Sequence, residues 1–409
     1  MREEARAGLY VHVPFCAVRC SYCDFSSGAL SAAAVERYLA ALEREAARRA
    51  PATAGLRFSS VFFGGGTPSA LAARHFERLW RTLAGSFTIA RDAEITLEAN
   101  PESVRGRLLD AWRRAGVNRL SMGAQSFDPV ELGRLGRLHD AARPGVALGL
   151  ARAHGFERLS LDLMFGFPGH GEASWRATLE RALDLEPEHL SAYCFIPEPG
   201  TPLGNAALAG AEPLPSPDLQ ADLYALLTGR LEAAGYGCYE TSNFCRPGAE
   251  ARHNLVYWLR RPYVGLGPSA HGFAGGARYG NHYALERWAA ALECSAAPEH
   301  ERELETEASA TSECVMLALR LGSGLRWADY APPLRRAIAR RYGVAFGRAL
   351  ESGRLEARDG GLAIPARHRF VADDVIATIE AAAARRGVDS AGSRSVPSGA
   401  CPSPPFPAA

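Results

Sequence analysis

The 409-residue chain lacks long apolar runs. No window reaches the ~18 unbroken apolar residues of a transmembrane helix, and the opening MREEARAGLYVHV has no stretch long enough for a signal peptide. A long run of basic residues is also lacking, and the formal net charge is +1. We therefore expect no membrane anchor and no non-specific binding to nucleic acid.

The sequence also lacks a disulfide framework. Its nine cysteines are an odd number, and only three of them lie close together. The other six are scattered at Cys194, Cys238, Cys245, Cys294, Cys314 and Cys401. A metal site built on thiolates needs a reducing compartment, so we expect the protein in the cytoplasm.

The three clustered cysteines, Cys16, Cys20 and Cys23, are spaced C-x3-C-x2-C in the run YVHVPFCAVRCSYCDF. Ferredoxin cubes take four cysteines, so three thiolates leave one iron of a [4Fe–4S] cube open to a small ligand. A zinc site with His12 as fourth ligand is the alternative. Zinc sites more often draw two ligands from each of two places, so the single compact group favours the cube.

Short β-rich runs alternate with Ala-, Arg- and Leu-rich helical stretches through the first half of the chain. The strand candidates are Leu9–Val13, Ser60–Phe63, Glu94–Glu98, Arg119–Met122, Leu159–Met164 and His189–Phe195. The helical stretches follow at about 31–49, 70–84, 103–115, 141–154, 172–185 and 218–234. This alternation predicts βαβ units and a parallel sheet. Six units are too few for a closed eightfold barrel, so we expect an α/β fold with an open, partial (β/α)6 barrel.

Polar and glycine residues gather where these strands end, and chemistry in parallel α/β folds sits at the carboxyl ends of strands. The cysteine cluster, Gly64–Gly66, Glu98, Gln125 and Asp162 all lie at or just beyond such ends. The glycines let a backbone approach a ligand closely, although a tight turn is an equally good interpretation of them alone. They lack the spacing of a nucleotide-phosphate loop.

The remaining chain divides by composition. We expect a barrel domain over 1–235, with a Pro-rich loop at 211–218, and a connecting Gly- and aromatic-rich region over 236–299 that contains HNLVYW. Residues 300–385 are expected to form a small helical domain with a hairpin near 353–364. The stretch 387–409 is small, Pro-rich and nearly uncharged, which predicts a disordered tail.

The cysteine spacing resembles that of the radical S-adenosylmethionine (SAM) superfamily. The resemblance implies that the amine and carboxylate of SAM chelate the open iron, and that reduction of the cube splits SAM into methionine and a 5′-deoxyadenosyl radical. GGGTP, the lead-in Y-x-H-x-P-F-C, EITLEANP, SMGAQSF, RLGRLHD and LSLDLMFGFPG are similar to segments of its coproporphyrinogen-oxidase-like group. The SAM-binding residues implied by this match are Tyr10, Gly65, Gly66, Thr67, Glu98, Gln125, Arg137 and Asp162.

This group has two main branches, the oxygen-independent coproporphyrinogen III oxidases and the haem chaperones of the HemW type. The oxidases carry a further cysteine two residues after the third, where this chain has Phe25, and a longer segment before the cluster. HNLVYW, residues 253–258, resembles the H-N-x-x-Y-W motif of the HemW branch, in which the histidine is implicated in haem binding. A buried, hydrogen-bonded His253 is the alternative, and His271 is a second candidate ligand.

The resemblance implies a chaperone that binds the cluster, SAM and haem. Neutral imidazole is a good axial haem ligand, and Tyr and Trp offer broad faces to a porphyrin. Recipients of the haem would be respiratory or other haem proteins, met at the membrane through partners, and a homodimer is an allowed state. The rival is the decarboxylating oxidase, and a haem-opening methyltransferase is a third option. The C-terminal region resembles the small winged-helix-like α+β domain of the group.

Overall fold

The computed structural model describes residues 6–358 and 360–389. These residues pack as two compact units. The first unit holds the chain up to residue 238 together with 242–256 and 261–304, and the second holds 239–241, 257–260 and the chain from 305 onward. The predicted tail at 387–409 lies outside the described residues except for 387–389, which continue the last helix.

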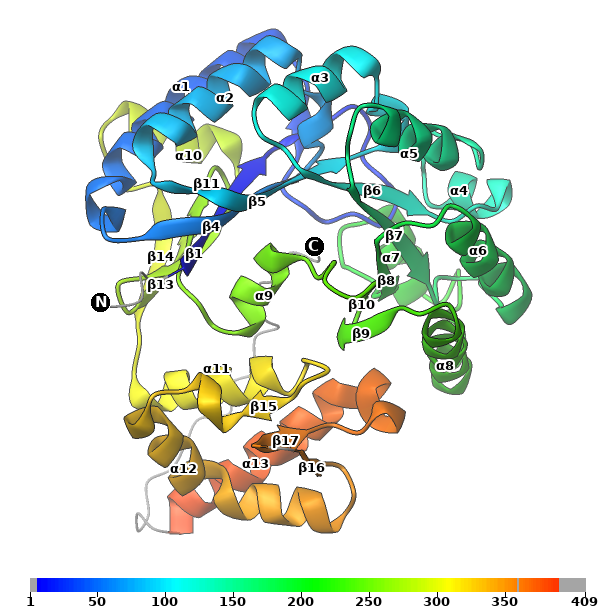
Figure 1. Ribbon diagram of the computed structural model, residues 1–409, viewed down its shortest axis with the longest axis vertical. Helices are drawn as coiled ribbons and strands as arrows, with labels where there is room; N and C mark the ends of the chain where they lie inside the picture. The colour runs from blue at the N-terminus through cyan, green and yellow to red at the C-terminus, as the bar shows by residue number, and fades with distance from the viewer. Residues whose placement is uncertain (1–5, 359, 390–409) are drawn as a thin grey trace. The chain divides into compact units, whose positions relative to one another are not determined.

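The first unit is a partial (β/α)6 barrel, as predicted. Its six barrel strands are β1 (Arg6–Val13), β4 (Arg57–Gly65), β5 (Ile89–Ala99), β6 (Arg119–Gln125), β7 (Arg158–Phe165) and β8 (His189–Cys194). Each pairs in parallel with the next. The helices between and after them include α1 (Ala32–Arg49), α2 (Ala73–Ser86), α3 (Gly106–Arg114), α5 (Arg143–Ala153), α6 (Glu172–Asp184) and α8 (Pro217–Ala233). The strands form an arc and these helices cover its outer side (Figure 1).

Burial on both faces explains why the strands have nearly continuous apolar sequences. Leu9, Val11 and Val13 of β1 are fully buried, and they alternate with Tyr10 and His12. Tyr10 packs with Phe62 on the neighbouring strand, away from the helices. The polar residues of the candidate site therefore belong to the inner face of the arc.

Further strands extend this sheet to twelve. Beside β1 lie β11 (Tyr263–Leu266), which is parallel to it, and then the antiparallel strands β12 (His271–Ala274), β13 (Ala277–Asn281) and β14 (Glu299–Leu304). Beside β8 lie β10 (Asn243–Cys245) and β9 (Gly237–Glu240). The region at 236–299, which the sequence sets apart by composition, thus contributes strands to the same sheet as the barrel.

Short elements complete the first unit and position loops around the strands. They include α4 (Pro129–Arg134), α7 (Pro202–Leu208) and α10 (Leu285–Glu293). HNLVYW forms most of α9 (Arg252–Trp258), which lies on the concave side of the arc (Figure 1).

The second unit consists mainly of helices around a small sheet. Helices α11 (Glu307–Ala318), α12 (Pro332–Glu351) and α13 (Ala372–Asp389) share an apolar core that includes Ile338, Tyr342 and Phe346. Strands β15 (Leu325–Arg326), β17 (Gly361–Ala363) and β16 (Glu356–Arg358) form an antiparallel sheet. The β16–β17 pair confirms the predicted hairpin, whereas the winged-helix likeness stays a prediction.

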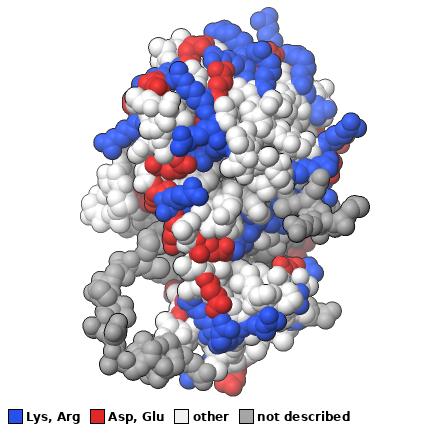
Figure 2. All heavy atoms as spheres, turned by 90° about the vertical axis from the view of Figure 1, so that its left-hand side faces the viewer, with Lys and Arg blue, Asp and Glu red and all other residues white. Residues whose placement is uncertain are grey.

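Charge is mixed over the surface. The chain has 46 basic and 45 acidic residues, and its sequence contains no lysine, so every basic group is an arginine. Figure 2 shows acidic and basic groups interspersed over the face that it presents. In the part of the chain that the structure describes, no helix is long and apolar enough to cross a membrane.

Candidate functional site

Cys16 ends the short strand β2 (Phe15–Cys16), Cys20 and Cys23 lie in the loop that follows it, and all three are half-buried. A turn brings Cys20 and Cys23 together, because the Cys23 backbone N–H donates to the Cys20 carbonyl at 3.3 Å. The loop is fixed on the barrel by Ser21, whose backbone N–H donates to the Leu135 carbonyl and whose Oγ donates to the Arg134 carbonyl. The pKa of the Cys23 thiol is raised to about 11, mainly by burial, with a contribution from the nearby Cys20 and Cys16 thiols.

Two polar side chains donate hydrogen bonds to these sulfurs. Thr67 Oγ1 lies 3.4 Å from Cys16 Sγ, and Arg137 Nη1 lies 3.3 Å from Cys20 Sγ. Hydrogen bonds and positive charge beside sulfur favour the thiolate form that metals bind. Among residues 6–358 and 360–389, no three His, Cys, Asp or Glu side chains converge on one metal-ion position. Three grouped thiols with donors to sulfur fit the ligand set of a cluster.

His12 does not complete a zinc site with these cysteines. Its Nε2 is hydrogen-bonded to the Ser26 carbonyl at 2.8 Å, and its Nδ1 is hydrogen-bonded to the Tyr10 hydroxyl at 3.1 Å. Both ring nitrogens are therefore occupied within the chain. Burial lowers the pKa of His12 to about 4, so the ring is neutral at physiological pH.

The glycines after β4 are required by close packing. Gly65 has φ +104°, and a Cβ added there would lie 2.6 Å from the His12 ring. A Cβ on Gly66 would lie 2.7 Å from the Phe15 carbonyl oxygen. The Gly65 N–H donates to Glu98 Oε2 at 3.2 Å. The segment therefore lies between Phe15, which precedes Cys16, and the carboxylate of Glu98 at the end of β5.

Two carboxyl groups face the barrel interior with raised pKa values. Burial is the main cause of the rise in the Glu98 pKa, and the charge of Asp162 adds to it. Burial also raises the pKa of Asp162 to about 6, although hydrogen bonds from Ser191 and Ser121 oppose the rise. Ser121 Oγ donates to Asp162 Oδ1 at 3.0 Å. Buried carboxylates of this kind gain stability from a positively charged guest.

Arg137 links the cysteine loop to the barrel strands. Its Nη2 donates to Asn100 Oδ1 at 2.8 Å and to the Gly123 carbonyl at 2.7 Å. Its Nε is buried and has no hydrogen-bond partner in the described part of the chain. Gln125, with φ +65°, has its amide nitrogen beside Gly123 in the same group. A buried donor without a partner is expected where a ligand supplies the acceptor.

His253 lies elsewhere in the barrel. Its Nδ1 is hydrogen-bonded to Ser60 Oγ at 2.9 Å, and its ring stacks on Phe62 with centroids 5.2 Å apart. The side chain is buried, with 1% exposed, and burial lowers its pKa to about 3. Ser60 precedes Gly65 by five residues on β4, which in a strand corresponds to about 16 Å. The His253 ring also stacks on Tyr10 of β1, with centroids 6.5 Å apart. The structure thus brings His253 beside one SAM-binding candidate, Tyr10, whereas Gly65 lies further along β4 toward the cysteine loop.

His271, the second candidate haem ligand, is partly exposed on β12. Its Nδ1 lies 3.8 Å from Glu301 Oε1 on β14. Burial lowers its pKa, and the Glu301 carboxylate opposes that shift. It belongs to the extension of the sheet beyond β1.

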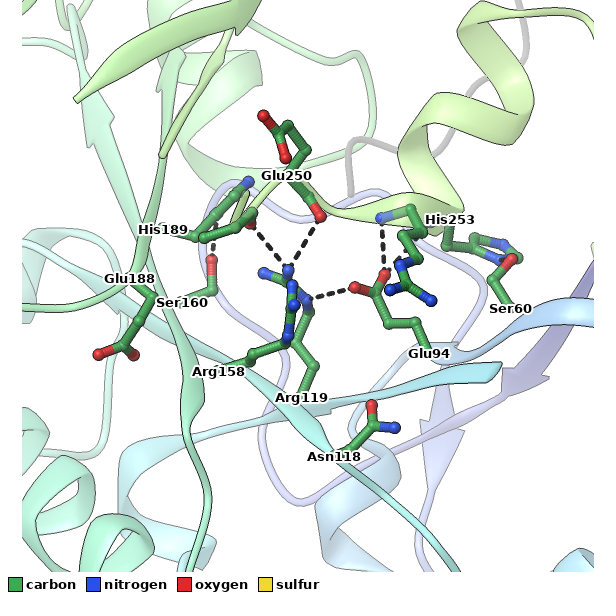
Figure 3. Close-up of polar contacts among 12 residues, drawn as sticks. Ser60, Glu94, Asn118, Arg119, Arg158, Ser160, Glu188, His189, Glu250 and His253 are labelled. Atoms are coloured by element: carbon green, nitrogen blue, oxygen red, sulfur yellow. Dashed lines mark hydrogen bonds and ion pairs between the residues drawn. The ribbon is translucent and has the colours of Figure 1, made fainter. Parts of the chain in front are cut away.

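Sequence reasoning missed a buried ion pair at the amino ends of the barrel strands (Figure 3). Arg119 Nε lies 3.0 Å from Glu94 Oε2, and each side chain is only 2% exposed. The available signal was an acidic residue, Glu94, and a basic residue, Arg119, inside the buried-strand patterns AEITLE and NRLSM. Such charges are rarely buried without a partner.

Comparison with known proteins places the chain in a family. Residues 10–182 match the Radical SAM superfamily. The heme chaperone HemW of Mycobacterium tuberculosis is 36% identical over 375 residues, which cover 91% of this chain and 94% of that protein. The chain belongs to the HemW family of radical SAM proteins. The HemW of Escherichia coli is 39% identical over 271 residues, covering 64% of this chain and 69% of its own.

This chain also shares its fold with the other branch of the group. The solved structure of coproporphyrinogen III oxidase (HemN) from Escherichia coli, a radical SAM enzyme, matches with a TM-score of 0.80 and 25% identity. The match covers 92% of this chain and 90% of that one. The superfamily implies a [4Fe–4S] cluster and SAM as cofactors, in agreement with the prediction from the cysteine spacing.

Proposed function

We propose that this chain is a haem chaperone that carries a [4Fe–4S] cluster, binds SAM and haem, and delivers haem to haem-dependent proteins. The observation that carries the proposal is the similarity to the HemW of Mycobacterium tuberculosis along 91% of the chain. The HNLVYW motif, which the sequence analysis associated with haem, lies within the same chain at residues 253–258.

Cys16, Cys20 and Cys23 would hold the cluster. When bound beside SAM, the cluster would supply the one electron that reductive cleavage of SAM needs. Thr67 and Arg137 orient the cysteine loop by their hydrogen bonds to sulfur. The remaining predicted residues would contact SAM, namely Tyr10, Gly65, Gly66, Glu98, Gln125 and Asp162. The buried carboxylates and the unpartnered Arg137 Nε fit a guest that carries both an ammonium and a carboxylate group.

Haem would be bound through His253, whose imidazole is kept neutral by burial, and neutral imidazole is the form that binds metals. The recipients would be haem proteins, respiratory enzymes among them. We propose that this delivery takes place in the cytoplasm and that the recipients provide the contact with the membrane. We also propose that the chaperone can act as a homodimer.

The rival function is oxidative decarboxylation of coproporphyrinogen III, and the TM-score of 0.80 to HemN favours it. Phe25 argues against it, because it stands where the oxidases are expected to carry a further cysteine. The two functions predict different products from one anaerobic preparation.

The test is made on cluster-reconstituted protein, with haem binding followed by absorbance and decarboxylation by product mass. We expect stoichiometric haem binding without decarboxylation. His253→Ala is expected to weaken haem binding with the iron and sulfide content intact, and Cys20→Ala to remove the cluster while haem binding persists. Decarboxylation without specific haem binding would establish the oxidase instead.

A further inference from the structure

The first turn of α9, which carries His253, is held by a carboxylate from a distant strand. Glu94 Oε1 accepts hydrogen bonds from the backbone N–H groups of Arg252 at 2.7 Å and His253 at 3.3 Å. These N–H groups have no partner inside a helix, and negative charge is favourable at this end. Glu94 Oε2 is paired in turn with Arg119 (Figure 3). One buried carboxylate thus joins α9 to the barrel.

Arg119 holds the residues just before α9. Its Nη2 donates to the carbonyls of Ala249 at 2.8 Å and Glu250 at 3.0 Å. Nearby, Arg158 Nη1 donates to the Gly248 carbonyl at 3.2 Å. Residues 248–253 are therefore attached along their length to the middle of β5 and to the amino ends of β6 and β7. The Glu94–Arg119 pair is the only buried ion pair between two fully charged side chains in this attachment, within the described residues.

In this position His253 has no open face for a porphyrin. The ring packs on Phe62, and its Nδ1 is bonded to Ser60. On β1, a Cβ added to Gly8 would lie only 3.1 Å from the His253 ring, so even a methyl group would be crowded there. A porphyrin is far larger than any of these side chains. An iron ligand must face the porphyrin plane, so His253 must move before it can bind haem.

We propose that Glu94 and Arg119 are positioning residues that hold His253 in an occluded state, and that haem binds after residues 249–256 leave this position. The inference rests on the proposed function, because it takes His253 as the haem ligand. The measured haem affinity is then reduced by the fraction of molecules in the open state. Loss of the Glu94–Arg119 contacts raises that fraction and tightens haem binding, the reverse of what loss of a ligand-supporting contact does.

Access of water supports this release. A cavity of about 210 Å³ lies beside the pair and is lined in part by Glu94, Arg252 and Asn118. When the first turn of α9 leaves, its N–H groups and the Glu94 carboxylate can be hydrated from this cavity. A polar group that becomes hydrated after losing its partner costs much less free energy than one that stays buried without a hydrogen-bond partner.

The decisive variant is Glu94→Leu combined with Arg119→Met. It removes both charges together and leaves neither buried alone, which is the replacement that proteins tolerate best. The control is Ser160→Ala, which removes the 2.5 Å hydrogen bond from Ser160 Oγ to His189 in the same layer of the barrel and leaves both Glu94 and Arg119 in place. If the double variant does not fold, Glu94→Gln, which keeps shape and one acceptor oxygen, is used and a smaller effect in the same direction is expected.

Two readouts are needed. The first uses no haem: acylation of His253 by diethyl pyrocarbonate, followed by the mass of its peptide. The second is haem titration by absorbance. In the double variant we expect His253 to react about 10-fold faster and haem to bind about 10-fold more tightly, as a tenfold larger open fraction requires. The control should match the parent in both.

Each failure has its own signature. Equal acylation of His253 in parent and double variant would overturn the occluded state, whatever the haem titration gives. Faster acylation with haem binding that is unchanged or weaker would overturn the link between occlusion and haem affinity. Adding His253→Ala to the double variant separates the proposed function. If that triple variant binds haem as tightly as the double variant, the assignment of His253 as ligand fails.

Discussion

Replacement of Arg137 by Met should separate cluster assembly from SAM binding. In the structure Arg137 donates to Cys20 Sγ, Asn100 Oδ1 and the Gly123 carbonyl, and its buried Nε has no acceptor. The methionine side chain fills similar volume but donates nothing. The three thiols remain, so iron and sulfide content after reconstitution should be unchanged, while a carboxylate bound at Nε loses its partner.

The size of the loss follows from one charge-assisted hydrogen bond. Such a bond contributes about 1.5–3 kcal/mol, which corresponds to roughly 10- to 150-fold in SAM affinity. Arg137→Lys should fall between the parent and Arg137→Met, because lysine keeps the charge but not the planar arrangement of donors that reaches three acceptors at once.

The assay is equilibrium binding of SAM to the anaerobic, cluster-loaded protein. Arg143→Met is the matched control, since Arg143 donates to the Pro101 and Val104 carbonyls on the same side of the barrel and to no sulfur. Its SAM affinity should stay within about twofold of the parent, a smaller change than the loss of one charge-assisted hydrogen bond causes. Equal SAM affinity in Arg137→Met and the parent, at equal iron content, would refute the role assigned to the Nε donor.

Three further outcomes are expected. Gly65→Ala should lower the thermal midpoint, because the added Cβ meets the His12 ring and φ is +104°. The expected strain is about 1–3 kcal/mol, and each kcal/mol lowers the midpoint by roughly 2–4 °C. An unchanged midpoint would contradict this expectation. Asp162 has its pKa raised to about 6, so its effect on stability is most favourable at low pH and is lost as pH rises from about 4 to 6. In unfolding experiments without SAM, Asp162→Asn should raise the free energy of unfolding at pH 7 by up to about 3 kcal/mol. A lower free energy of unfolding in this variant at pH 7 would contradict the raised pKa. His253, with a pKa of about 3, stabilises the fold fully above pH 6.5 and less as pH falls. His253→Gln should make the decline in the free energy of unfolding below pH 6.5 shallower by about 1.4 kcal/mol per pH unit, and an unaltered slope would argue against a buried neutral imidazole.

The barrel could be predicted because its signals are local. The predicted run Leu159–Met164 differs from β7 (Arg158–Phe165) by one residue at each end, and its apolar residues are buried by helices that follow directly in the chain. The same alternation gives the placement of Cys16, Gly65 and Asp162, because parallel strands with helical crossovers place their carboxyl ends at one edge.

The extension of the sheet and the environment of His253 could not be read in this way. Strand β11 has four residues and pairs with β1, with Leu9 opposite Val264. Helix α9 has seven residues, too few to be stable alone, and its first turn is bonded to Glu94, 158 residues earlier. Both depend on contacts between segments that are distant in the sequence, and the alternation of apolar residues does not predict such contacts. HNLVYW therefore indicated an aromatic surface for a porphyrin, and the structure buries its histidine.

The place of β1 between β4 and β11 has a consequence for synthesis of the protein. Roughly 250 residues separate Leu9 from Val264, so at about 5–20 residues per second the ribosome needs about 12–50 s to supply the partner strand. During that time β1, which leads into the cysteine loop, has one unpaired edge, and such edges are templates for pairing with other chains. If iron is loaded during translation, the barrel is still open on this side. Because the edge of β1 stays unpaired until β11 is made, slow translation or a stall before residue 263 should favour aggregation of the nascent chain.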